Sequence, residues 1–272
     1  MTIPVASVLI TGASSGLGAA LAEAYAAPGV SLWLGGRDET RLADVAARCR
    51  ERDADVAASI VDVTDRDAVE RWIGECEAVR PLDLVVANAG ISAGTGGLAK
   101  DGGIEAPIQA QRIFAVNVTG VFNTVEPAVA FMRRHAPRPN VPHSACRGQI
   151  AIVSSLAGFH GFPGAPAYSA SKAAIKAWGE AIGPILATEG IGVSVICPGF
   201  VATPMTATND FRMPLLMTAE AAARHMRQGL ARNSPLIAFP WPMHAGVWLL
   251  RALPTRLASR ILGGTPRKRP FD

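Results

Sequence analysis

Val8-Leu-Ile-Thr-Gly-Ala-Ser-Ser-Gly-Leu-Gly18 is the stretch of sequence that decides the fold. Its apolar start predicts a buried strand, its glycines a tight turn, and the alanine-rich residues that follow a helix. In such a junction Gly12 permits the sharp turn, Gly16 lets the backbone approach a pyrophosphate, and Gly18 lets helix and strand pack closely. The N–H groups at the start of the helix then attract an anion. The stretch therefore predicts a phosphate-binding turn in an α/β fold.

Short apolar runs and alanine-rich helical stretches alternate after this turn. The apolar runs predict buried strands, and the helical spacing between them predicts crossover helices. Such alternation gives a Rossmann-type, doubly wound parallel sheet of about seven strands with helices on both faces. The predicted strands are Val5–Ile10, Val30–Leu34, Val56–Val61, Leu82–Ala87, Gln149–Val153, Gly192–Ile196 and Leu236–Phe239, and the predicted helices include Leu17–Ala27, Glu39–Arg52, Asp65–Val79 and Pro107–Arg133.

Residues typical of helix starts and helix ends support these boundaries. Asp38 is expected to cap the second helix, Thr64 or Asp65 the third, and Pro28-Gly29 ends the first. The proline-rich stretch 137–142 is too short to separate domains. We therefore expect one dinucleotide-binding and catalytic domain over residues 1–240, followed by an amphipathic extension and a basic tail over residues 241–272.

Composition narrows the function classes. Hydrophobic residues make up 49% of the 272 residues, and the formal net charge is +4. The Lys and Arg residues are mostly interspersed with acidic residues, so nucleic acid is not an expected partner. Four cysteines lie far apart with no histidine at metal-ligand spacing, which favours reduced thiols and no metal site. No signal peptide is visible before Thr11, and no run of about 18 apolar residues predicts a spanning helix. We expect a cytoplasmic protein.

The tip of the second predicted strand indicates the cofactor. In dinucleotide folds an acidic residue here hydrogen-bonds the ribose 2′-hydroxyl of NAD, whereas an arginine pairs with the 2′-phosphate of NADP. The strand ends Leu32-Trp-Leu-Gly-Gly-Arg37, which favours NADP. Asp38 beside it and the lack of a basic residue at Ser14-Ser15 keep NAD as the alternative.

Tyr168 and Lys172 are candidates for proton transfer. They lie in Ala167-Tyr-Ser-Ala-Ser-Lys-Ala-Ala174, which is predicted to be helical from Pro166, and their spacing puts both on one helix face. An ammonium group beside a phenol is expected to lower a pKa that is ordinarily about 10. Such a phenol can donate a proton to a carbonyl oxygen or accept one from an alcohol. Upstream, Ser154 and Ser155 end a buried strand, where ligands bind in open α/β sheets.

The order of these motifs resembles that of the short-chain dehydrogenase/reductase family. The resemblance runs from Val5 to about Thr206. Each motif alone is modest evidence, but together and in order they are specific. The motifs are Thr11-Gly-Ala-Ser-Ser-Gly-Leu-Gly18, Asp62-Val, Asn88-Ala-Gly90, Asn117, Ser155, Tyr168-x-x-x-Lys172 and Pro198-Gly-Phe-Val-Ala-Thr203.

The resemblance implies a catalytic role for four residues. Tyr168 would be the general acid/base, and Lys172 would lower its pKa and hold the nicotinamide ribose. Ser155, at the family's usual interval before the tyrosine, would orient the substrate oxygen, and Asn117 would hold a water that links Lys172 to solvent.

The same resemblance implies the cofactor contacts. Asp62 would meet the adenine, Asn88-Ala-Gly90 would line the cofactor cleft, and Val201 and Thr203 would contact the carboxamide. The full set is Gly12, Ser14, Ser15, Gly16, Leu17, Gly18, Arg37, Asp62, Val63, Asn88, Ala89, Gly90, Tyr168, Lys172, Pro198, Gly199, Val201 and Thr203, with no metal.

The substrate end of the site is less well specified. The resemblance makes residues 204–217 a lid, in which Met205 and Phe211 suggest a lipophilic substrate, although the same apolar residues could merely cover the core. His160 is a weaker candidate for substrate contact. The segment Arg134–Arg147 is longer than usual in the family, and we expect a surface insertion there.

The last thirty residues are atypical of that family. Trp241–Leu262 predicts an apolar, interrupted helix that Pro254 kinks, flanked by Arg251, Arg256 and Arg260. This helix could pack on the body or a partner subunit, or it could lie on an anionic membrane surface. A basic tail, Arg267-Lys-Arg269, follows.

These features together predict an NADP(H)-dependent oxidoreductase that interconverts a carbonyl and a secondary alcohol on a small molecule. By resemblance we expect a homodimer or homotetramer. Two alternatives remain: a non-catalytic dinucleotide-binding sensor or scaffold, and a sugar-nucleotide epimerase or dehydratase. A sensor would not need Tyr168, Lys172 or Ser155, and an epimerase usually carries a larger C-terminal substrate domain.

Overall fold

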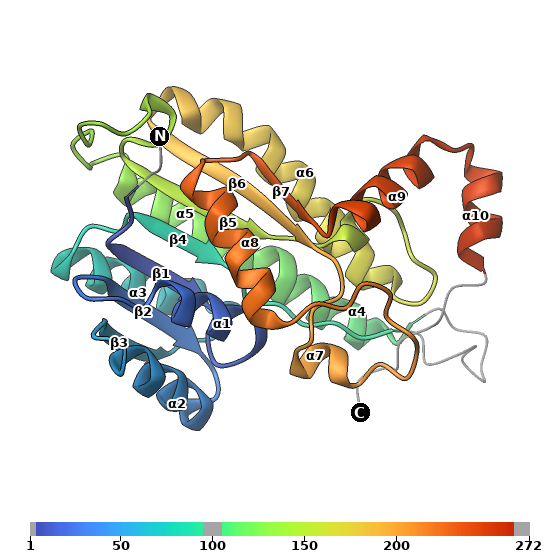
Figure 1. The fold of residues 1–272 in the computed structure, drawn as a ribbon, viewed down its shortest axis with the longest axis horizontal. Helices are drawn as coiled ribbons and strands as arrows, with labels where there is room; N and C mark the ends of the chain where they lie inside the picture. Colours follow the sequence, from blue (N-terminus) through green and yellow to red (C-terminus); the bar gives the residue numbers. More distant parts are fainter. Residues whose placement is uncertain (1–3, 95–104, 264–272) are drawn as a thin grey trace.

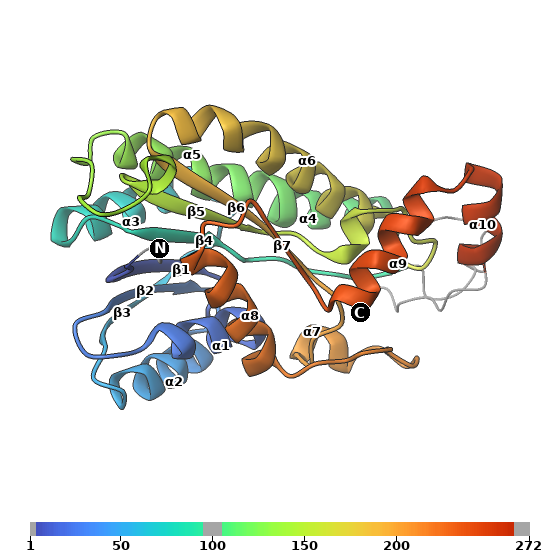
Figure 2. The same cartoon turned by 45° about the horizontal axis from the view of Figure 1, so that its top comes forward.

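Seven parallel strands form one twisted sheet between two layers of helices (Figures 1 and 2). The computed structural model describes residues 4–94 and 105–263. In the order β3-β2-β1-β4-β5-β6-β7, the chain runs outward from β1 in one direction and then, from β4, in the other. This reversal leaves a crevice at the carboxyl ends of β1 and β4, where ligands bind in such sheets. The strands are β1 (Ser7–Thr11), β2 (Ser31–Gly36), β3 (Asp55–Ile60), β4 (Leu84–Ala87), β5 (Gly148–Val153), β6 (Ile191–Pro198) and β7 (Leu236–Phe239).

The helices divide between the two faces of the sheet. One face carries α1 (Gly16–Tyr25), α2 (Glu39–Arg50) and α8 (Ala219–Ala231), while the other carries α3 (Arg66–Val79), α4 (Pro107–Phe114), α5 (Gly120–Met132) and α6 (Pro166–Thr188) (Figure 2). Alternate residues of β1 supply both cores: Val8 and Ile10 pack towards α1, whereas Leu9 packs towards α3 and α5. The period of two along a buried strand explains why both faces are apolar.

The predicted fold class is confirmed, and the predicted elements differ from the observed ones mainly at their ends. Asp38 caps α2 by accepting from the N–H of Arg41 at 2.9 Å, and Asp65 caps α3 by accepting from the N–H of Ala68 at 3.0 Å. The predicted single helix over Pro107–Arg133 is instead α4 and α5 joined by a π-helical turn, η1 (Ala115–Thr119). Helix α8 was not among the predicted elements.

The run Pro107–Met132 is long and apolar enough by composition to cross a membrane. It packs against the sheet and α3, and 56% of its most apolar window is buried inside the protein. A buried core helix accounts for its composition. It is the only such helix among the residues that the structure describes.

The predicted C-terminal helix is two helices, α9 (Trp241–Ala252) and α10 (Thr255–Gly263), separated at Leu253-Pro254. Both extend away from the end of the sheet where α9 begins (Figure 1). The predicted basic tail at 267–269 lies outside the described residues.

The insertion over Arg134–Arg147 is held to the body by Asp83. The Asp83 carboxylate accepts from the backbone N–H groups of Ala6 at 2.7 Å and Ser7 at 3.1 Å, and it forms a salt bridge with Arg138 of the insertion. One largely buried carboxylate therefore holds both the start of β1 and the insertion.

Removing this carboxylate should lower stability measurably. We expect Asp83→Ala to lower the free energy of unfolding by about 2 kcal/mol, because two N–H groups and a guanidinium lose a part-buried partner. Chemical denaturation checks this. Asp55→Ala, at an exposed site at the start of β3, is the control and should stay within about 0.5 kcal/mol of the unmodified protein. Equal losses in the two variants would contradict the role of Asp83.

Candidate active site

The glycine turn between β1 and α1 leaves backbone exposed at the crevice. Gly12 and Gly16 have φ of +65° and +55°, in the left-handed region that favours glycine. A Cβ on Gly18 would collide with the carbonyl oxygen of Gly12 and lie 2.6 Å from the side-chain amide of Asn88. Ser15, the N-cap of α1, makes no side-chain capping hydrogen bond, so the first N–H groups of α1 lack that partner and are suited to an anion.

Asn88 and Thr11 connect the end of β4 to this turn. The Asn88 side-chain amide donates to the carbonyl oxygens of Thr11 at 2.9 Å and Gly12 at 3.2 Å. The Thr11 hydroxyl oxygen in turn accepts from the backbone N–H groups of Asn88 and Ala89, at 3.0 and 3.1 Å. Asn88 thus fixes the shape of the turn, a role beyond the cleft-lining one that the sequence suggested.

Four charged side chains, Arg37, Asp38, Arg41 and Asp62, lie after β2 and β3 at one end of the crevice. Arg37 and Asp62 form a salt bridge of 3.6 Å, and Arg41 lines the same cavity one turn into α2. Partial burial tends to raise the pKa of Asp62, but hydrogen bonds from Thr64 and the Arg37 guanidinium outweigh it and hold that pKa below its usual range. Asp38 is engaged as the cap of α2 and in a salt bridge with Arg41. No carboxylate occupies the tip of β2, where Gly36 stands.

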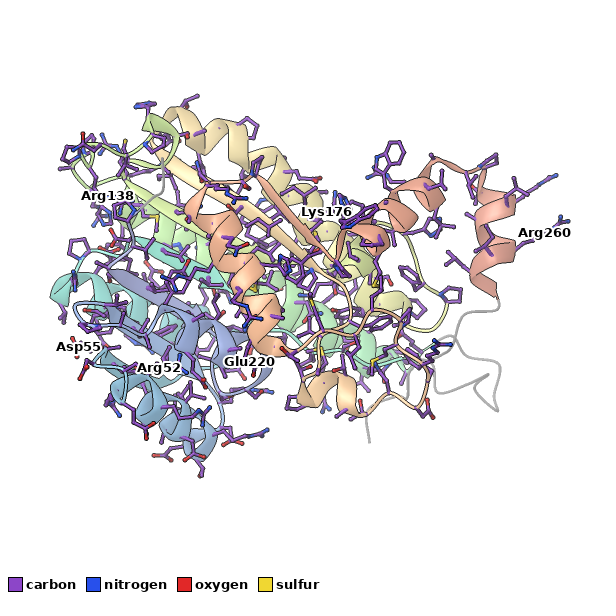
Figure 3. The ribbon with its side chains drawn as sticks, viewed as in Figure 1. Arg52, Asp55, Arg138, Lys176, Glu220 and Arg260 are labelled. Carbon is purple, nitrogen blue, oxygen red and sulfur yellow. The ribbon has the colours of Figure 1, made fainter. Side chains whose placement is uncertain are left out.

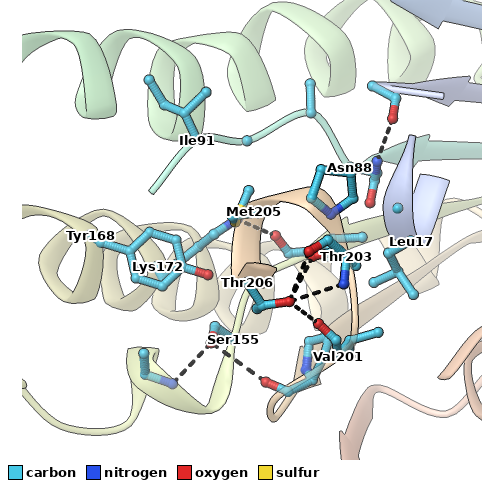
Figure 4. Close-up of a pocket in the computed structure, with 18 of the residues that line it drawn as sticks. Leu17, Asn88, Ile91, Ser155, Tyr168, Lys172, Val201, Thr203, Met205 and Thr206 are labelled. Atoms are coloured by element: carbon cyan, nitrogen blue, oxygen red, sulfur yellow. Dashed lines mark hydrogen bonds between the residues drawn. The ribbon is translucent and has the colours of Figure 1, made fainter. Parts of the chain in front are cut away.

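Tyr168 and Lys172 project from the first turns of α6 into the cavity (Figure 4). The Lys172 ammonium lies 5.9 Å from the centre of the Tyr168 ring and donates to the carbonyl oxygen of Val153 at 2.7 Å. Burial lowers the pKa of Lys172 to about 8. The nitrogen is therefore held in place by the last residue of β5.

The pKa of Tyr168 differs from the sequence-based expectation. Burial raises it, while the hydroxyl of Ser155 acts in the opposite direction. The expected lowering by Lys172 is absent because its ammonium is directed to the backbone of β5 and the phenol has little water around it.

The two serines after β5 have separate tasks. Ser154 is buried and donates to the carbonyl oxygen of Lys172 at 2.7 Å, which ties α6 to β5. Ser155 faces the cavity beside Tyr168 and accepts from the N–H of Ala157 at 3.1 Å (Figure 4). The geometry thus supports the choice of Ser155 as the substrate-facing serine.

Asn117 lies in the π-helical turn η1, behind the cavity wall. Its amide donates to the carbonyl oxygen of Ile91 at 2.9 Å and to the Ser171 hydroxyl at 3.0 Å, and its oxygen accepts from the N–H of Ile91 at 2.8 Å. A Cβ on Gly90 would lie 3.3 Å from the Asn117 oxygen and 3.4 Å from the Lys172 nitrogen. Asn117 therefore braces the loop after β4 against α6, and the water that it was expected to hold stays a prediction.

All these groups surround one cavity of about 670 Å³. Of the predicted site residues, Gly18, Asn117 and His160 do not line it: the first two support the wall from behind. His160 points elsewhere, with its ring nitrogen 3.1 Å from the Gly161 carbonyl oxygen, so its predicted substrate contact is not supported by the geometry. The predicted residues that do line the cavity are Gly12, Ser14, Ser15, Gly16, Leu17, Arg37, Asp62, Val63, Asn88, Ala89, Gly90, Ser155, Tyr168, Lys172, Pro198, Gly199, Val201, Thr203, Met205 and Phe211.

The predicted lid divides into two parts. Thr203 begins the short helix α7 (Pro204–Ala207) with a capping box shared with Thr206, and Met205 and Phe211 line the cavity. Met217, at the other end, bridges to Val201 and packs against the core instead.

Several cavity residues escaped the sequence analysis. Ile91 and Phe162 come from loops. Met243 and Val247 come from α9, which is far from the glycine turn in the sequence. No sequence pattern relates α9 to Tyr168, because α9 reaches the cavity only when β7 joins the sheet in the folded protein.

A phosphate-binding turn at the reversal point of a parallel sheet, beside a tyrosine, a lysine and a serine, defines a dinucleotide-binding oxidoreductase. The chain belongs to the short-chain dehydrogenase/reductase family, since the family model described as short chain dehydrogenase matches residues 6–212. The bare backbone at Gly12, Gly16 and Gly18 fits the nicotinamide dinucleotide that this family uses.

Relatives agree with this assignment along most of the chain. An uncharacterized oxidoreductase of Myxococcus xanthus is 37% identical over 93% of this chain and 91% of its own length. An uncharacterized oxidoreductase of Mycobacterium tuberculosis is 31% identical over 93% of this chain and 96% of its own length. A short-chain dehydrogenase from Sphingobium yanoikuyae, solved in complex with NADPH, is 25% identical, covers 98% of both chains and has a TM-score of 0.73.

The glycine turn can be tested by a single methyl group. We expect Gly18→Ala to weaken dinucleotide binding at least about tenfold, because the added carbon displaces the Gly12 carbonyl and the Asn88 amide that shape the turn. Fluorescence titration with NADPH measures this. The matched control is Gly161→Ala, where an added Cβ meets nothing within 4 Å. Unchanged binding in Gly18→Ala would show that the turn does not hold the cofactor.

Proposed function

We propose that the protein is an NADP(H)-dependent oxidoreductase that interconverts a carbonyl and a secondary alcohol on a lipophilic small molecule. The observation that carries this proposal is the meeting of Tyr168, Ser155 and Lys172 in the cavity that also contains the glycine turn. A sensor or scaffold would have no use for this arrangement.

Each polar group has a part in the proposed reaction. The bound nicotinamide dinucleotide supplies or accepts the hydride. In the reducing direction the Tyr168 phenol donates its proton to the carbonyl oxygen as negative charge develops there, and the Ser155 hydroxyl donates a second hydrogen bond to the same oxygen. Lys172, held by the Val153 carbonyl, would bind the ribose hydroxyls of the cofactor and return a proton to Tyr168. Asn117 positions Lys172 through the loop at Gly90 and through α6.

The preference for NADP rests on the adenosine end of the cavity. Arg37 and Arg41 present two guanidinium groups there, whereas the carboxylate of Asp38, beyond the end of β2, is occupied by Arg41 and the cap of α2. Guanidinium groups pair well with a 2′-phosphate. The Sphingobium relative, solved with NADPH, agrees with this preference.

The lipophilic substrate is inferred from the walls beyond Tyr168. They are formed by apolar side chains from four separate segments of the chain: Leu156, Phe162, Met205, Phe211, Met243 and Val247. Flexible methionines next to aromatic rings suit an apolar ligand of irregular shape.

We further propose a cytoplasmic homodimer or homotetramer that assembles through the helical run that carries Asn117 (α4, η1 and α5) and through α6, which carries Tyr168. Ile185 on α6 has 62% of its surface exposed, and Phe114, just before the π turn, has 39%. Apolar side chains of this kind on neighbouring helices are suited to contact with a second copy.

Replacing the proposed proton donor should separate chemistry from binding. We expect Tyr168→Phe to lower kcat about 10²–10⁴-fold because the proton transfer is lost, and to leave NADPH binding within about twofold. The measurement is NADPH consumption across ketone substrates. Tyr25, the only other tyrosine, is buried at the end of α1 and does not line the cavity, so Tyr25→Phe serves as the control. Full activity in Tyr168→Phe, or cofactor binding without turnover of any carbonyl by the unmodified enzyme, would reject the proposal.

The raised pKa of Tyr168 predicts opposite pH profiles for the two directions. Below this pKa the phenol keeps its proton, so reduction should be nearly level between about pH 6 and 8. Oxidation needs the phenolate, so its kcat should rise about tenfold per pH unit over the same range. Steady-state kinetics in both directions tests this, and an oxidation rate that falls with rising pH would contradict it.

Cofactor choice should depend on the two arginines. We expect Arg37→Ala/Arg41→Ala to weaken NADPH binding about 10- to 100-fold and to leave NADH binding nearly unchanged, because only NADPH carries the 2′-phosphate. Isothermal titration with both cofactors measures this. Arg66→Ala, an exposed arginine paired with Glu126 away from the cavity, is the control. A parallel loss for both cofactors would assign the arginines a structural role.

A further inference from the structure

The outward face of α9 is apolar and uncovered in the described structure. Trp241, Trp248 and Leu249 have 76, 62 and 59% of their surfaces exposed. At helical spacing these three residues lie on one side of α9, and the exposed Ala245 and Ala252 lie between them. That side of the helix carries no charged or hydrogen-bonding group apart from the indole N–H groups.

Helix α10 also exposes apolar side chains. Leu257 and Ile261 are 48 and 58% exposed, whereas Ala258 and Leu262 of the same helix are buried. We call the exposed set the C-terminal apolar patch, and it consists of Trp241, Trp248, Leu249, Leu257 and Ile261. Patches of this kind mark interaction surfaces, unlike single exposed apolar residues.

The charges on α9 and α10 all have one sign. Arg251, Arg256 and Arg260 are exposed, and residues 241–263 contain no Asp or Glu. Within the described part of the chain none of the three arginines forms a salt bridge. Figure 3 shows Arg260 on the side of α10 that faces away from the body.

Charge and composition favour a lipid surface over a second copy of the patch. A symmetric contact between two patches would bring six arginines together without a carboxylate, and the repulsion would oppose association. An anionic bilayer offers opposite charge to the arginines, and the headgroup region is where tryptophan side chains are enriched.

The inner face of α9 places this patch beside the site. Met243 and Val247 line the cavity, and the His244 ring packs edge-on against Phe159 of η3 (Leu156–Gly158 and its cap), with ring centres 5.2 Å apart. Phe159 in turn lies under the Lys176 ammonium on α6, at 4.5 Å. Helix α9 thus lies between the substrate end of the cavity and the exposed patch, and the contact of His244 with Phe159 orients it.

We propose that α9 and α10 form a docking surface for an anionic membrane, with the patch in the headgroup region and the substrate end of the cavity next to the lipid. The part of this proposal that concerns substrate delivery rests on the proposed function: a carbonyl compound dissolved in the bilayer would reach Tyr168 past α9. Binding to the membrane itself does not depend on it.

Vesicle binding tests the proposal directly. The full-length protein is sedimented with vesicles of phosphatidylcholine alone or mixed with phosphatidylglycerol. We expect binding to the mixed vesicles, an at least tenfold loss in Trp241→Ser/Trp248→Ser, and about 100-fold less preference for anionic lipid in Arg251→Gln/Arg256→Gln/Arg260→Gln. Matched controls are Val79→Ser/Ile60→Ser, at apolar sites on the body that are 73 and 56% exposed, and Arg66→Gln/Arg71→Gln/Arg224→Gln.

Three outcomes would overturn the proposal. The first is no binding of the unmodified protein to mixed vesicles, and the second is equal binding by the patch variants and the controls. The third is that Trp241→Ser/Trp248→Ser converts a dimer to a monomer while no variant binds vesicles. Thermal unfolding verifies that the variants, all at exposed sites, are folded. NADPH binding and turnover of a water-soluble ketone without vesicles are measured separately, so a failure of the proposed function leaves the vesicle result interpretable.

Discussion

The close approach of backbone at the first strand–helix junction is the constraint on which the rest of the structure depends. Gly18 lies directly over the Gly12 carbonyl, and the Asn88 amide closes the gap from β4. This contact fixes the direction of α1, leaves the N–H groups at its start facing the crevice, and joins the two halves of the sheet at the point where strand order reverses. The side chains proposed for catalysis, after β5 and on α6, depend on this junction because it sets where a dinucleotide can lie.

Burial sets the pKa values of Lys172 and Tyr168, and hydrogen bonds hold the elements that carry them in place. Lys172 is buried beside Val153, so its ammonium is destabilised and its pKa falls, and the phenol of Tyr168 is destabilised as an anion for the same reason. Each group is therefore closer to its neutral form than it would be in water. Ser154, Ser171 and Asn117 hold the helix, strand and loop that carry these groups.

Local chemistry made the fold and the polar half of the site predictable from sequence. Asp38 and Asp65 predicted where their helices begin, because an N-cap contacts only residues next to it in the sequence. The spacing of four between Tyr168 and Lys172 predicted that both lie on one helix face. Prediction failed where long-range contacts decide the outcome. Met243 and Val247 reach the cavity through β7, and His160, in a loop that no periodicity governs, does not line it. The pKa of Tyr168 depends on burial, which spacing does not reveal.

The π turn at Ala115–Thr119 acts as a phase shift in a long helix. Each residue of an α-helix advances by about 100°, so one additional residue in a turn rotates everything after it by that amount. Before the turn, Ile113 faces the loop after β4, and after it Val121, Val125 and Ala128 still face the sheet. Asn117 sits in the wide turn, where its amide reaches both Ile91 and Ser171. Loss or gain of one residue here would leave the length of the helix almost unchanged, yet it would turn either the asparagine or the apolar stripe out of register with the sheet.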